Sequence, residues 1–321
     1  MFARQKLKIL ANLFNAAMDY NPNKLIIASR DSKLALWQSH YVRNLLELVD
    51  PNINCDILTM KTQGDKILDR PLNEIGGKAL FMKELEIAME EGRADIAVHS
   101  LKDIPYELPK GFALGAFCER ENPQDAFVSN NFVKIDDLLK GAIIGTSSLR
   151  RKAQILAYRP DLDIRNLRGN IQTRLKKLDE GQYDAIILAA AGLIRLGIAS
   201  RIKSFIDLNI SLPAVGQGTV VVEYLAKNIQ IKKLLSKIDH PDARNYALAE
   251  RSFNETLQGG CHSPIAAFCE KHTQGLHLIA MVASIDGKRL IREALVGDDP
   301  STLGQALAEK MIAQGAKKIL Q

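Results

Sequence analysis

The sequence predicts an α/β protein with two lobes around a cleft, followed by a small α+β domain. Three observations predict this fold. Short apolar runs alternate with amphipathic stretches from residue 24 onward, as they do where strands alternate with helices. This alternation stops in an irregular segment, 105–111, and then restarts in a second unit of similar length. The chain after residue 238 follows a different pattern, with a hairpin signal and a final amphipathic helix.

In the first unit, strands are expected where aliphatic residues cluster, and helices where apolar residues recur every three or four positions. "KLIIAS" and "ADIAVHS" are typical of strands, and Leu85 and Ala88 share one face of the second predicted helix. The expected strands are 24–29, 55–61, 94–100 and 112–118, and the expected helices are 34–48 and 76–92. A further extended segment is expected at 125–129, before the second unit begins.

The second unit repeats this order, and the chain then leaves it through a loop. The apolar run 219–224 after that loop could return to the first unit, which would make a hinged pair of lobes with a cleft between them. Asp286-Gly287 between two apolar runs is a strong hairpin signal. The expected strands are 142–148, 162–167, 183–191, 276–285 and 288–297, and the expected helices are 149–159, 170–181, 242–257 and a last one carrying Leu303, Leu307 and Met311.

These patterns divide the chain into four segments. The first is an N-terminal extension, which we interpret as a short helical extension or a start-site artefact. We do not interpret it as a targeting segment, because its apolar core is too short and too interrupted for a secretory signal and it has no serine, unlike a typical transit peptide. The expected boundaries are 1–23 for the extension, 24–118 with 219–238 for domain 1, 119–218 for domain 2, and 239–321 for domain 3.

The composition is that of an ordinary globular protein. Of the 321 residues, 46% are hydrophobic and 25% charged, which excludes a disordered or fibrous chain, and the net charge of +6 decides little. No apolar run reaches the roughly 18 residues that a membrane span needs. The four cysteines form no CxxC pair and the six histidines no HxH or HExxH motif, so we expect neither a disulfide scaffold nor a metal. We expect a cytoplasmic protein.

The stretch "GTSSLRRKAQ", residues 145–154, places two arginines at the predicted start of a helix. A helix N-terminus carries a partial positive charge, so cations there indicate a nearby anion. Further arginines lie near the ends of predicted strands, which form the ligand crevice of an open α/β sheet. A solvated basic face is the alternative for any one arginine, but the set favours a ligand with several negative groups. The set is Arg150, Arg151, Arg168, Arg174 and Arg195, with hydroxyls from Thr146, Ser147 and Ser148.

Lys102 and Asp103 directly follow the predicted strand in "AVHSLKDIP". A lysine beside an aspartate at the mouth of a cleft can tune the carboxylate for proton transfer or for holding a cationic N–H group. The alternative is a turn in which the aspartate only caps the backbone. Arg30 and Ser32 follow the first predicted strand and could face the same crevice, and Lys78 lies at the start of another helix that could face an anion.

Cys261 lies in "QGGCHSPIA", between two glycines and a proline, which predicts an exposed and tightly turned loop. Cysteine without a disulfide is usually buried and inert, as expected for Cys55, Cys118 and Cys269 in apolar strands. An exposed thiol on a constrained loop indicates covalent attachment, nucleophilic catalysis or metal binding. His262 is adjacent, but loop neighbours tend to point apart, so we give it little weight.

Together these motifs resemble the porphobilinogen deaminase (hydroxymethylbilane synthase) family of tetrapyrrole biosynthesis. The resemblance runs from about residue 24 to the C-terminus, and the order of the motifs is far more specific than any one of them. The motifs are "IASRDSKLALWQ", "GGKALFMKELE", "DIAVHSLKDIP", "RENPQDAFVS", "GTSSLRRKAQ", "LRGNIQTRL", "YDAIILAAAGLIRLG", "LPAVGQG" and "GGC".

The resemblance implies three α/β domains, of which the first two are arranged like a two-lobed periplasmic binding protein. It implies a monomeric enzyme that condenses four porphobilinogen molecules head to tail, with loss of ammonia, into the linear tetrapyrrole hydroxymethylbilane. A dipyrromethane cofactor, built from two substrate units, would be attached to Cys261 through a thioether. Asp103 would be the catalytic carboxylate, which interacts with pyrrole N–H groups and assists the loss of ammonia.

The resemblance also implies which residues bind the acetate and propionate groups, and the arginines at the helix start would be counterions of these carboxylates. Gln258 and Ser263 depart from the residues common in the family's cysteine loop. The implied cofactor-binding residues are Arg30, Ser32, Lys102, Ser148, Arg150, Arg151 and Arg174, and the implied substrate-binding residues are Lys78, Ser100, Thr146, Ser147, Arg168, Arg195 and Gln217.

Two other classes of function use some of the same residues. A two-lobed binding protein for an acidic small molecule would need an export signal and would have no use for Cys261. A nucleic-acid-binding protein could place the arginines on phosphates, but 6% aromatic residues and no recognisable motif argue against it. We therefore expect no nucleic-acid and no membrane partner.

Overall fold

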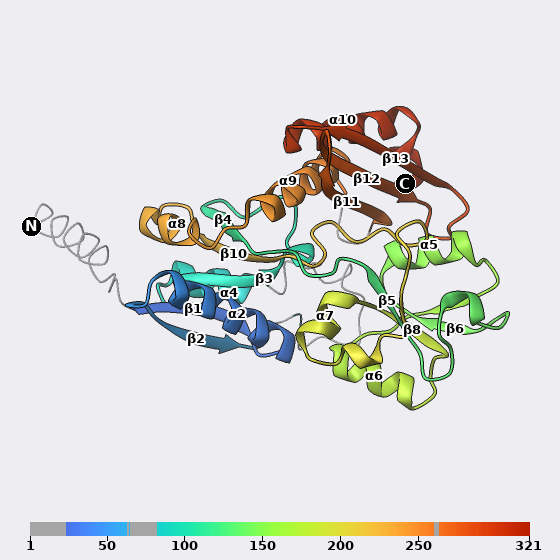
Figure 1. Ribbon diagram of the computed structural model, residues 1–321, viewed down its shortest axis with the longest axis horizontal. Coiled ribbons are helices and arrows are strands. Elements are labelled where there is room, and N and C mark those ends of the chain that lie inside the picture. Colours follow the sequence, from blue (N-terminus) through green and yellow to red (C-terminus); the bar gives the residue numbers. More distant parts are fainter. Residues whose placement is uncertain (1–23, 63, 65–81, 260–262) are drawn as a thin grey trace, which may run out of the picture.

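The computed structural model describes residues 24–62, 64, 82–259 and 263–321 (Figure 1). In this part of the chain the strands form two sheets of five strands and one of three. We refer to the units built on them as lobe 1, lobe 2 and the C-terminal domain, in the order in which the chain enters them. The predicted fold, two α/β lobes and a small C-terminal α+β domain, is confirmed.

The sheet of lobe 1 has the order β2 (Asn54–Met60), β1 (Lys24–Arg30), β3 (Ile96–Ser100), β10 (Val220–Leu225) and β4 (Phe112–Phe117). β1 pairs in parallel with β2 and β3, whereas β10 lies between β3 and β4 and runs antiparallel to both. The apolar run 219–224 therefore returns to the first unit, as predicted.

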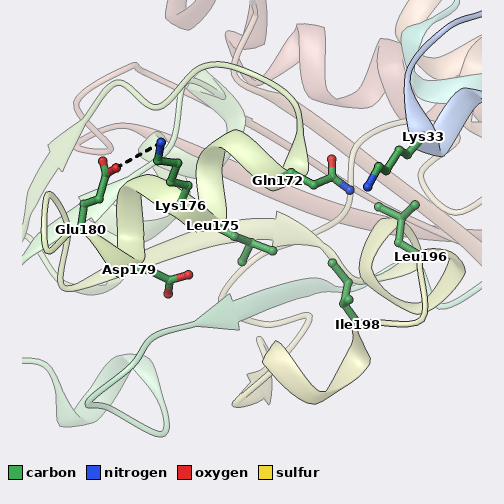
Figure 2. A pocket seen from close by; sticks show the side chains of 8 residues that line it. All are labelled: Lys33, Gln172, Leu175, Lys176, Asp179, Glu180, Leu196 and Ile198. Atoms are coloured by element: carbon green, nitrogen blue, oxygen red, sulfur yellow. Dashed lines mark ion pairs between the residues drawn. The ribbon is translucent and has the colours of Figure 1, made fainter.

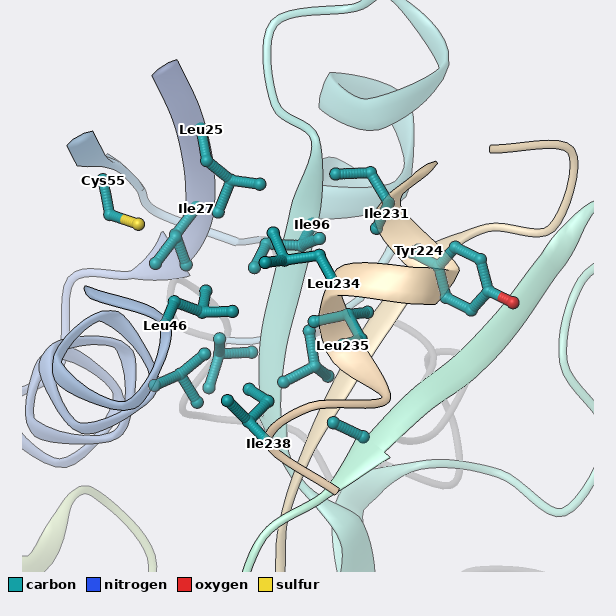
Figure 3. Close-up of a cluster of buried hydrophobic side chains, with 14 of the residues drawn as sticks. Leu25, Ile27, Leu46, Cys55, Ile96, Tyr224, Ile231, Leu234, Leu235 and Ile238 are labelled. Carbon is teal, nitrogen blue, oxygen red and sulfur yellow. The ribbon is translucent and has the colours of Figure 1, made fainter. Parts of the chain in front are cut away.

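Helices cover both faces of this sheet. α2 (Lys33–Val49) and α8 (Ile229–Leu235) lie on one face, where Leu46 packs among the buried residues of β1, β3 and β10 (Figure 3). α4 (Lys83–Glu90) packs on other strand residues through Leu85. Burying a large aliphatic side chain contributes about 1.5–3 kcal/mol, so packing on both sides holds β3 firmly in the middle of the sheet.

Lobe 2 has a sheet in the order β7 (Asp163–Arg165), β6 (Ile143–Gly145), β8 (Ala185–Ala189), β5 (Asp125–Val128) and β9 (Ser204–Phe205). β6 pairs in parallel with β7 and β8, and β5 pairs antiparallel with β8 and β9. Its helices are α5 (Leu149–Tyr158), α6 (Ile171–Asp179) and α7 (Ala190–Arg195), and the short 3₁₀ helices η4 (Ile135–Asp137) and η5 (Ala199–Arg201) lie in its loops.

Three expected strands in lobe 2, 142–148, 162–167 and 183–191, were too long, and the last of them shows why. The apolar run 183–191 is a strand only as far as Ala189, because Ala190 and Ala191 already belong to α7. Alanine has the highest helix propensity of any residue, and an apolar run that is buried in both a strand and a helix gives no change of periodicity at the junction. The short helices α7 and α8 were likewise not expected.

The C-terminal domain consists of α9 (Pro241–Thr256), β11 (Ile265–His272), β12 (Gly275–Ala283), β13 (Leu290–Gly297), α10 (Pro300–Ala313) and α11 (Ala316–Leu320). β12 and β13 form the predicted antiparallel hairpin around Asp286-Gly287. Gly287 has φ +72°, and a Cβ there would collide with the backbone of Ala153 on α5. The hairpin tip of this domain therefore packs closely against lobe 2.

Two segments cross between the lobes, 118–124 and 206–219, and hydrogen bonds fasten them to each other. The side-chain amide of Gln217 donates to the carbonyl oxygen of Pro123 at 2.6 Å. The N–H of Glu121 donates to a carbonyl oxygen of the second segment at 3.1 Å. The two crossings thus form one structural unit.

The C-terminal domain is tied to these crossings by a buried carboxylate, Glu250 of α9. Glu250 pairs with Arg120 at 2.6 Å and accepts a hydrogen bond from the N–H of Gly216 at 2.6 Å. It also accepts from the N–H of Cys269 on β11 at 2.9 Å. One side chain therefore joins both crossings to the sheet of the C-terminal domain.

Glu86 of α4 generates a prediction about stability. Burial, and then the charge of Glu223, raise the pKa of Glu86 from 4.5 to about 7. The folded protein binds this proton more tightly than the unfolded chain, so stability falls as the pH rises from about 4.5 to about 7. Glu86→Gln should therefore stabilise the protein at pH 8 by on the order of 1 kcal/mol, since Glu86 is partly exposed to screening solvent, and much less at pH 5.

Urea denaturation of the purified protein at these two pH values measures the effect. Glu107→Gln, at an exposed position of lobe 1, is the matched control and should change stability little at either pH. A Glu86→Gln protein with the same stability gain at both pH values would contradict the prediction.

Candidate active site

Lobe 1 presents Lys102 and Asp103 at the end of its central strand. β3 ends at Ser100, and the 3₁₀ helix η3 (Leu101–Asp103) follows at once. The N–H of Leu101 donates to the carbonyl oxygen of Thr219 at 2.9 Å, and the Leu101 side chain is buried. The turn that carries the half-buried Lys102 and Asp103 is therefore anchored to Thr219, the residue just before β10.

Three more predicted residues of lobe 1 lie at the ends of β1 and β3. Arg30 is the last residue of β1, and Ser32 is the N-cap of α2, accepting a hydrogen bond from the N–H of Ala35 at 3.3 Å. The hydroxyl of Ser100 accepts from the side-chain amide of Gln38 on α2 at 2.7 Å. These residues end parallel neighbours in the sheet, so they lie on the same edge as Asp103.

In lobe 2, the predicted hydroxyl residues build the turn between β6 and α5. Ser148 is the N-cap of α5 and accepts from the N–H of Arg151 at 3.4 Å. The Ser147 hydroxyl donates to the carbonyl oxygen of Leu167 at 2.9 Å and accepts from its N–H at 3.0 Å. Thr146 is buried and accepts from the N–H of Ser148 at 3.2 Å. These hydroxyls therefore stabilise the turn between β6 and α5 through hydrogen bonds within the chain itself.

Arg174 of α6 links the two lobes electrostatically. Burial, and then the charge of Arg151, lower the pKa of Arg174 to about 10, while the charge of Asp103 opposes this and that of Arg168 adds to it. Asp103 of lobe 1 and Arg151 and Arg168 of lobe 2, predicted separately from the sequence, therefore lie near enough to Arg174 for their charges to act on its pKa.

The two arginines at the start of α5 meet a carboxylate of the chain itself, that of Asp125 on β5. Arg150 donates to it at 2.8 and 3.1 Å, and Arg151 at 2.8 and 3.0 Å. Ser211 and Gln217, from the second crossing, donate to the same carboxylate at 2.8 and 3.0 Å. All five side chains are buried. This cluster of Asp125, Arg150, Arg151, Ser211 and Gln217 is called the Asp125 cluster below.

Asp125 is an anion of the kind that the two arginines at the start of α5 indicated. Burial alone would raise the pKa of Asp125, but Arg150 and Arg151 outweigh it and hold that pKa well below its usual range. The neighbouring anion is thus an ionised protein carboxylate. This carboxylate was not predicted from the sequence. The aspartate that opens the apolar run "DAFVS" does indicate a basic partner, because buried aspartates are almost always paired. A solvated basic face is excluded for both arginines.

Arg195 and Gln217 fasten the crossings. Arg195 is buried, donates to the carbonyl oxygen of Gly218 at 2.6 Å and lies over the ring of Trp37, 5.4 Å from its centroid. Gln217 bonds Asp125 and the first crossing, as described above. Two predicted site residues, Cys261 and Lys78, and the neighbouring His262 lie outside the described residues.

A groove of about 580 Å³ lies where the lobes meet (Figure 2). Lys33, the first residue of α2, lines it from lobe 1, and Gln172 of α6 points toward Lys33 from lobe 2. Leu175, Leu196 and Ile198 give it apolar walls. None of these is a predicted site residue, although Lys33 follows Ser32 directly.

Among the residues that the structure describes, no group of three or more histidine, cysteine, aspartate or glutamate side chains could hold a metal ion. A search of the same residues for a helix long and apolar enough to cross a membrane found none. The predicted site residues that the structure describes are mainly guanidinium groups and hydroxyls, and they follow the ends of strands in the sheets of lobe 1 and lobe 2.

Comparison with known proteins identifies the family. Residues 25–233 match the family model described as "Porphobilinogen deaminase, dipyromethane cofactor binding domain", and residues 245–313 match "Porphobilinogen deaminase, C-terminal domain". The chain belongs to the porphobilinogen deaminase family. A curated porphobilinogen deaminase from Francisella tularensis subsp. tularensis (strain FSC 198) is 60% identical over 298 residues, covering 93% of this chain and 99% of that protein. One from Francisella philomiragia is 61% identical with the same coverage.

Solved structures give more distant likenesses. The methionine binding protein MetQ has 13% identity and a TM-score of 0.44, covering 74% of this chain and 97% of that one. The VFT2 domain of Bordetella pertussis BvgS has 15% identity and a TM-score of 0.42, covering 70% of this chain and 89% of that one.

The described residues fit the family's dipyrromethane cofactor, which carries several carboxylates. Burial, and then the charge of Arg151, lower the pKa of Arg174, so an anionic ligand beside these arginines of this porphobilinogen deaminase family member would interact favourably with them. Cys55, Cys118 and Cys269 are buried, and burial raises the pKa of each thiol to about 12, which leaves them inert as expected.

The Asp125 cluster generates a second prediction. Asp125→Asn removes a buried negative charge and leaves Arg150 and Arg151 facing each other, so the free energy of unfolding should fall by about 3–5 kcal/mol. Asp179→Asn is the control, because Asp179 pairs with Arg201 at 2.6 Å on the exposed surface and its loss should change stability by less than about 1 kcal/mol. Guanidinium or urea denaturation measures both, and equal effects of the two substitutions would contradict the prediction.

Proposed function

We propose that this protein is a porphobilinogen deaminase that condenses four porphobilinogen molecules, with loss of ammonia, into hydroxymethylbilane. The family is that of a transferase with a dipyrromethane cofactor, and its membership favours this activity over a two-lobed binding protein. The observation that carries the proposal is the match of residues 25–233 and 245–313 to the two models of this family, and the charges of Asp103, Arg151 and Arg168 near Arg174 support it.

Asp103 is proposed as the catalytic carboxylate. It stands at the end of the central strand, where both the sheet and the contact of Leu101 with Thr219 fix its backbone. A fixed carboxylate can accept hydrogen bonds from pyrrole N–H groups and stabilise the positive charge that develops on a ring as its ammonia leaves. The charge of Arg174 interacts with Asp103, which favours the ionised form that this role needs.

The cations around Asp103 are proposed to bind acetate and propionate groups. When bound, the dipyrromethane supplies the pyrrole carbon at which the product begins to grow, and Cys261 is proposed to hold it through a thioether. Arg30 and Lys102 of lobe 1 and Arg168 and Arg174 of lobe 2 would neutralise its carboxylates and orient its rings relative to Asp103. Guanidinium groups suit this task because they pair with carboxylates bidentately and stay charged.

The remaining expectations form part of the same proposal. We propose the domain boundaries 24–118 with 219–238, 119–218 and 239–321, with the cofactor attached to the last domain. We also propose that the enzyme acts as a cytoplasmic monomer without nucleic-acid or membrane partners. Porphobilinogen would be its one small-molecule substrate.

The attachment to Cys261 is tested by intact mass. The purified protein should be heavier than its 35.5 kDa chain by two pyrrole units, and Cys261→Ala should have the mass of the chain alone while remaining folded. Cys55→Ala, which changes a buried thiol, should keep the added mass. An added mass in Cys261→Ala would move the attachment elsewhere.

The role of Asp103 is tested by Asp103→Asn. The amide cannot stabilise a developing cation as a carboxylate does, so turnover should fall by about 10²–10⁴-fold while the two-pyrrole mass is retained. Asp56→Asn, which removes an exposed partner of Lys24 in the same lobe, is the control and should turn over normally. Near-normal turnover of Asp103→Asn would show that Asp103 only caps the backbone of the turn and has no catalytic role.

A further inference from the structure

A buried hydrogen-bonded pair of side chains crosses the sheet of lobe 1 just before the turn that carries Asp103. Nε2 of His99 lies 3.0 Å from Oε2 of Glu223, and the two side chains are 6% and 0% exposed. His99 stands opposite Val221 in the β3–β10 ladder, and Glu223 stands opposite Ala97. The pair therefore spans the two strands diagonally, in addition to their backbone hydrogen bonds.

Two ionisable side chains are unusual at this position, because the neighbouring residues of β10 are buried and apolar. Glu223 interrupts β10, whose sequence is otherwise the apolar run "VVVEYL", and its Oε1 atom has no hydrogen-bond partner among the described residues. Burying a carboxylate with an unsatisfied oxygen is costly, and well-packed apolar residues in place of such a pair are often neutral or stabilising. Stability therefore gives no sufficient account of the pair.

Its position suggests another role, because both strands lead to the same turn. β3 continues through Ser100 into η3, which ends at Asp103, and β10 begins one residue after Thr219, which holds the N–H of Leu101. A change in the twist or the register between β3 and β10 would move both supports of η3. The side-chain bond of His99 to Glu223 opposes such a change from inside the sheet.

A third element, α4, meets the pair on the same side of the sheet. Glu86 of α4 lies close enough to Glu223 for the charge of Glu223 to contribute to raising the pKa of Glu86. Leu85 of the same helix packs with Ala97, which is two residues before His99 on β3. The pair thus lies between the strand that ends near Asp103 and the helix that backs it.

We propose that His99 and Glu223 are positioning residues, whose buried pair fixes the ends of β3 and β10 and thereby the placement of the Asp103 carboxylate. Neither residue would touch substrate or cofactor. Their loss should lower kcat, which depends on the geometry of Asp103, and should spare KM and cofactor attachment, which depend on the cations and on Cys261. This inference rests on the proposed function.

The test compares His99→Leu, His99→Gln and Glu223→Met with wild type, using porphobilinogen as substrate and purified holoenzyme. The side-chain amide introduced by His99→Gln can still donate to Glu223, whereas the apolar side chains introduced by His99→Leu and Glu223→Met remove one partner of the bond. We expect kcat to fall at least tenfold in His99→Leu and Glu223→Met with KM within twofold, and His99→Gln to recover most of the loss. Intact mass should show two added pyrrole units in all three variants. His277→Gln is the control, because His277 pairs with Glu270 at 3.4 Å in the C-terminal domain.

The outcomes separate the two proposals. A wild-type protein that does not convert porphobilinogen overturns the proposed function itself. With an active wild type, the positioning role is overturned if His99→Leu and Glu223→Met lose no more kcat than His277→Gln, if His99→Gln is no better than His99→Leu, or if kcat falls only in proportion to the folded fraction measured by denaturation. If His99→Leu does not fold, Glu223→Met, which keeps the length of the side chain, decides by the first and third criteria.

Discussion

The pairing of Asp125 with two guanidinium groups is the interaction on which the rest of the site depends. An isolated carboxylate cannot be buried at this depth, and two adjacent arginines cannot be buried together without an anion, so each member makes the others possible. Because Ser211 and Gln217 donate to the same carboxylate, the start of α5 is held to the second crossing as well as to β5. The edge of lobe 2 and the connection between the lobes are therefore one rigid unit.

This constraint divides the arginines of the site into two kinds. Arg150, Arg151 and Arg195 are buried and bonded to groups of the chain itself, so they shape the site and contribute charge to it from behind. Arg174 is different, because it lies outside the Asp125 cluster and its pKa is lowered by burial and then by the charge of Arg151, while the charge of Asp103 raises it. Carboxylates bound beside Arg174 would relieve its repulsion from Arg151, which belongs to the Asp125 cluster.

The sequence was sufficient for most of the fold because the fold depends on local patterns. Apolar runs and helical periodicity located the described strands except β9 and β11, and the long helices, and Asp286-Gly287 located the hairpin. The return of 219–224 to lobe 1 was predicted from its apolar character alone. Short helices such as Ala190–Arg195 were missed, since six residues are too few to show a period and alanine runs continue an apolar strand without a break.

The site was predictable in its residue types but not in its pairings. Arginines after strands indicate an anion, yet whether the anion is a ligand or a residue 25 positions away depends on which strands become neighbours. The same holds for His99 and Glu223, which are 124 positions apart and meet only because β10 returns beside β3. Buried pairs of this kind are determined by topology. Local sequence patterns therefore reveal the arginines of the site but not the carboxylates with which buried side chains pair. In this protein those carboxylates, Asp125 and Glu223, belong to strands of different lobes, and each lies in a strand next to one that leads into the candidate site.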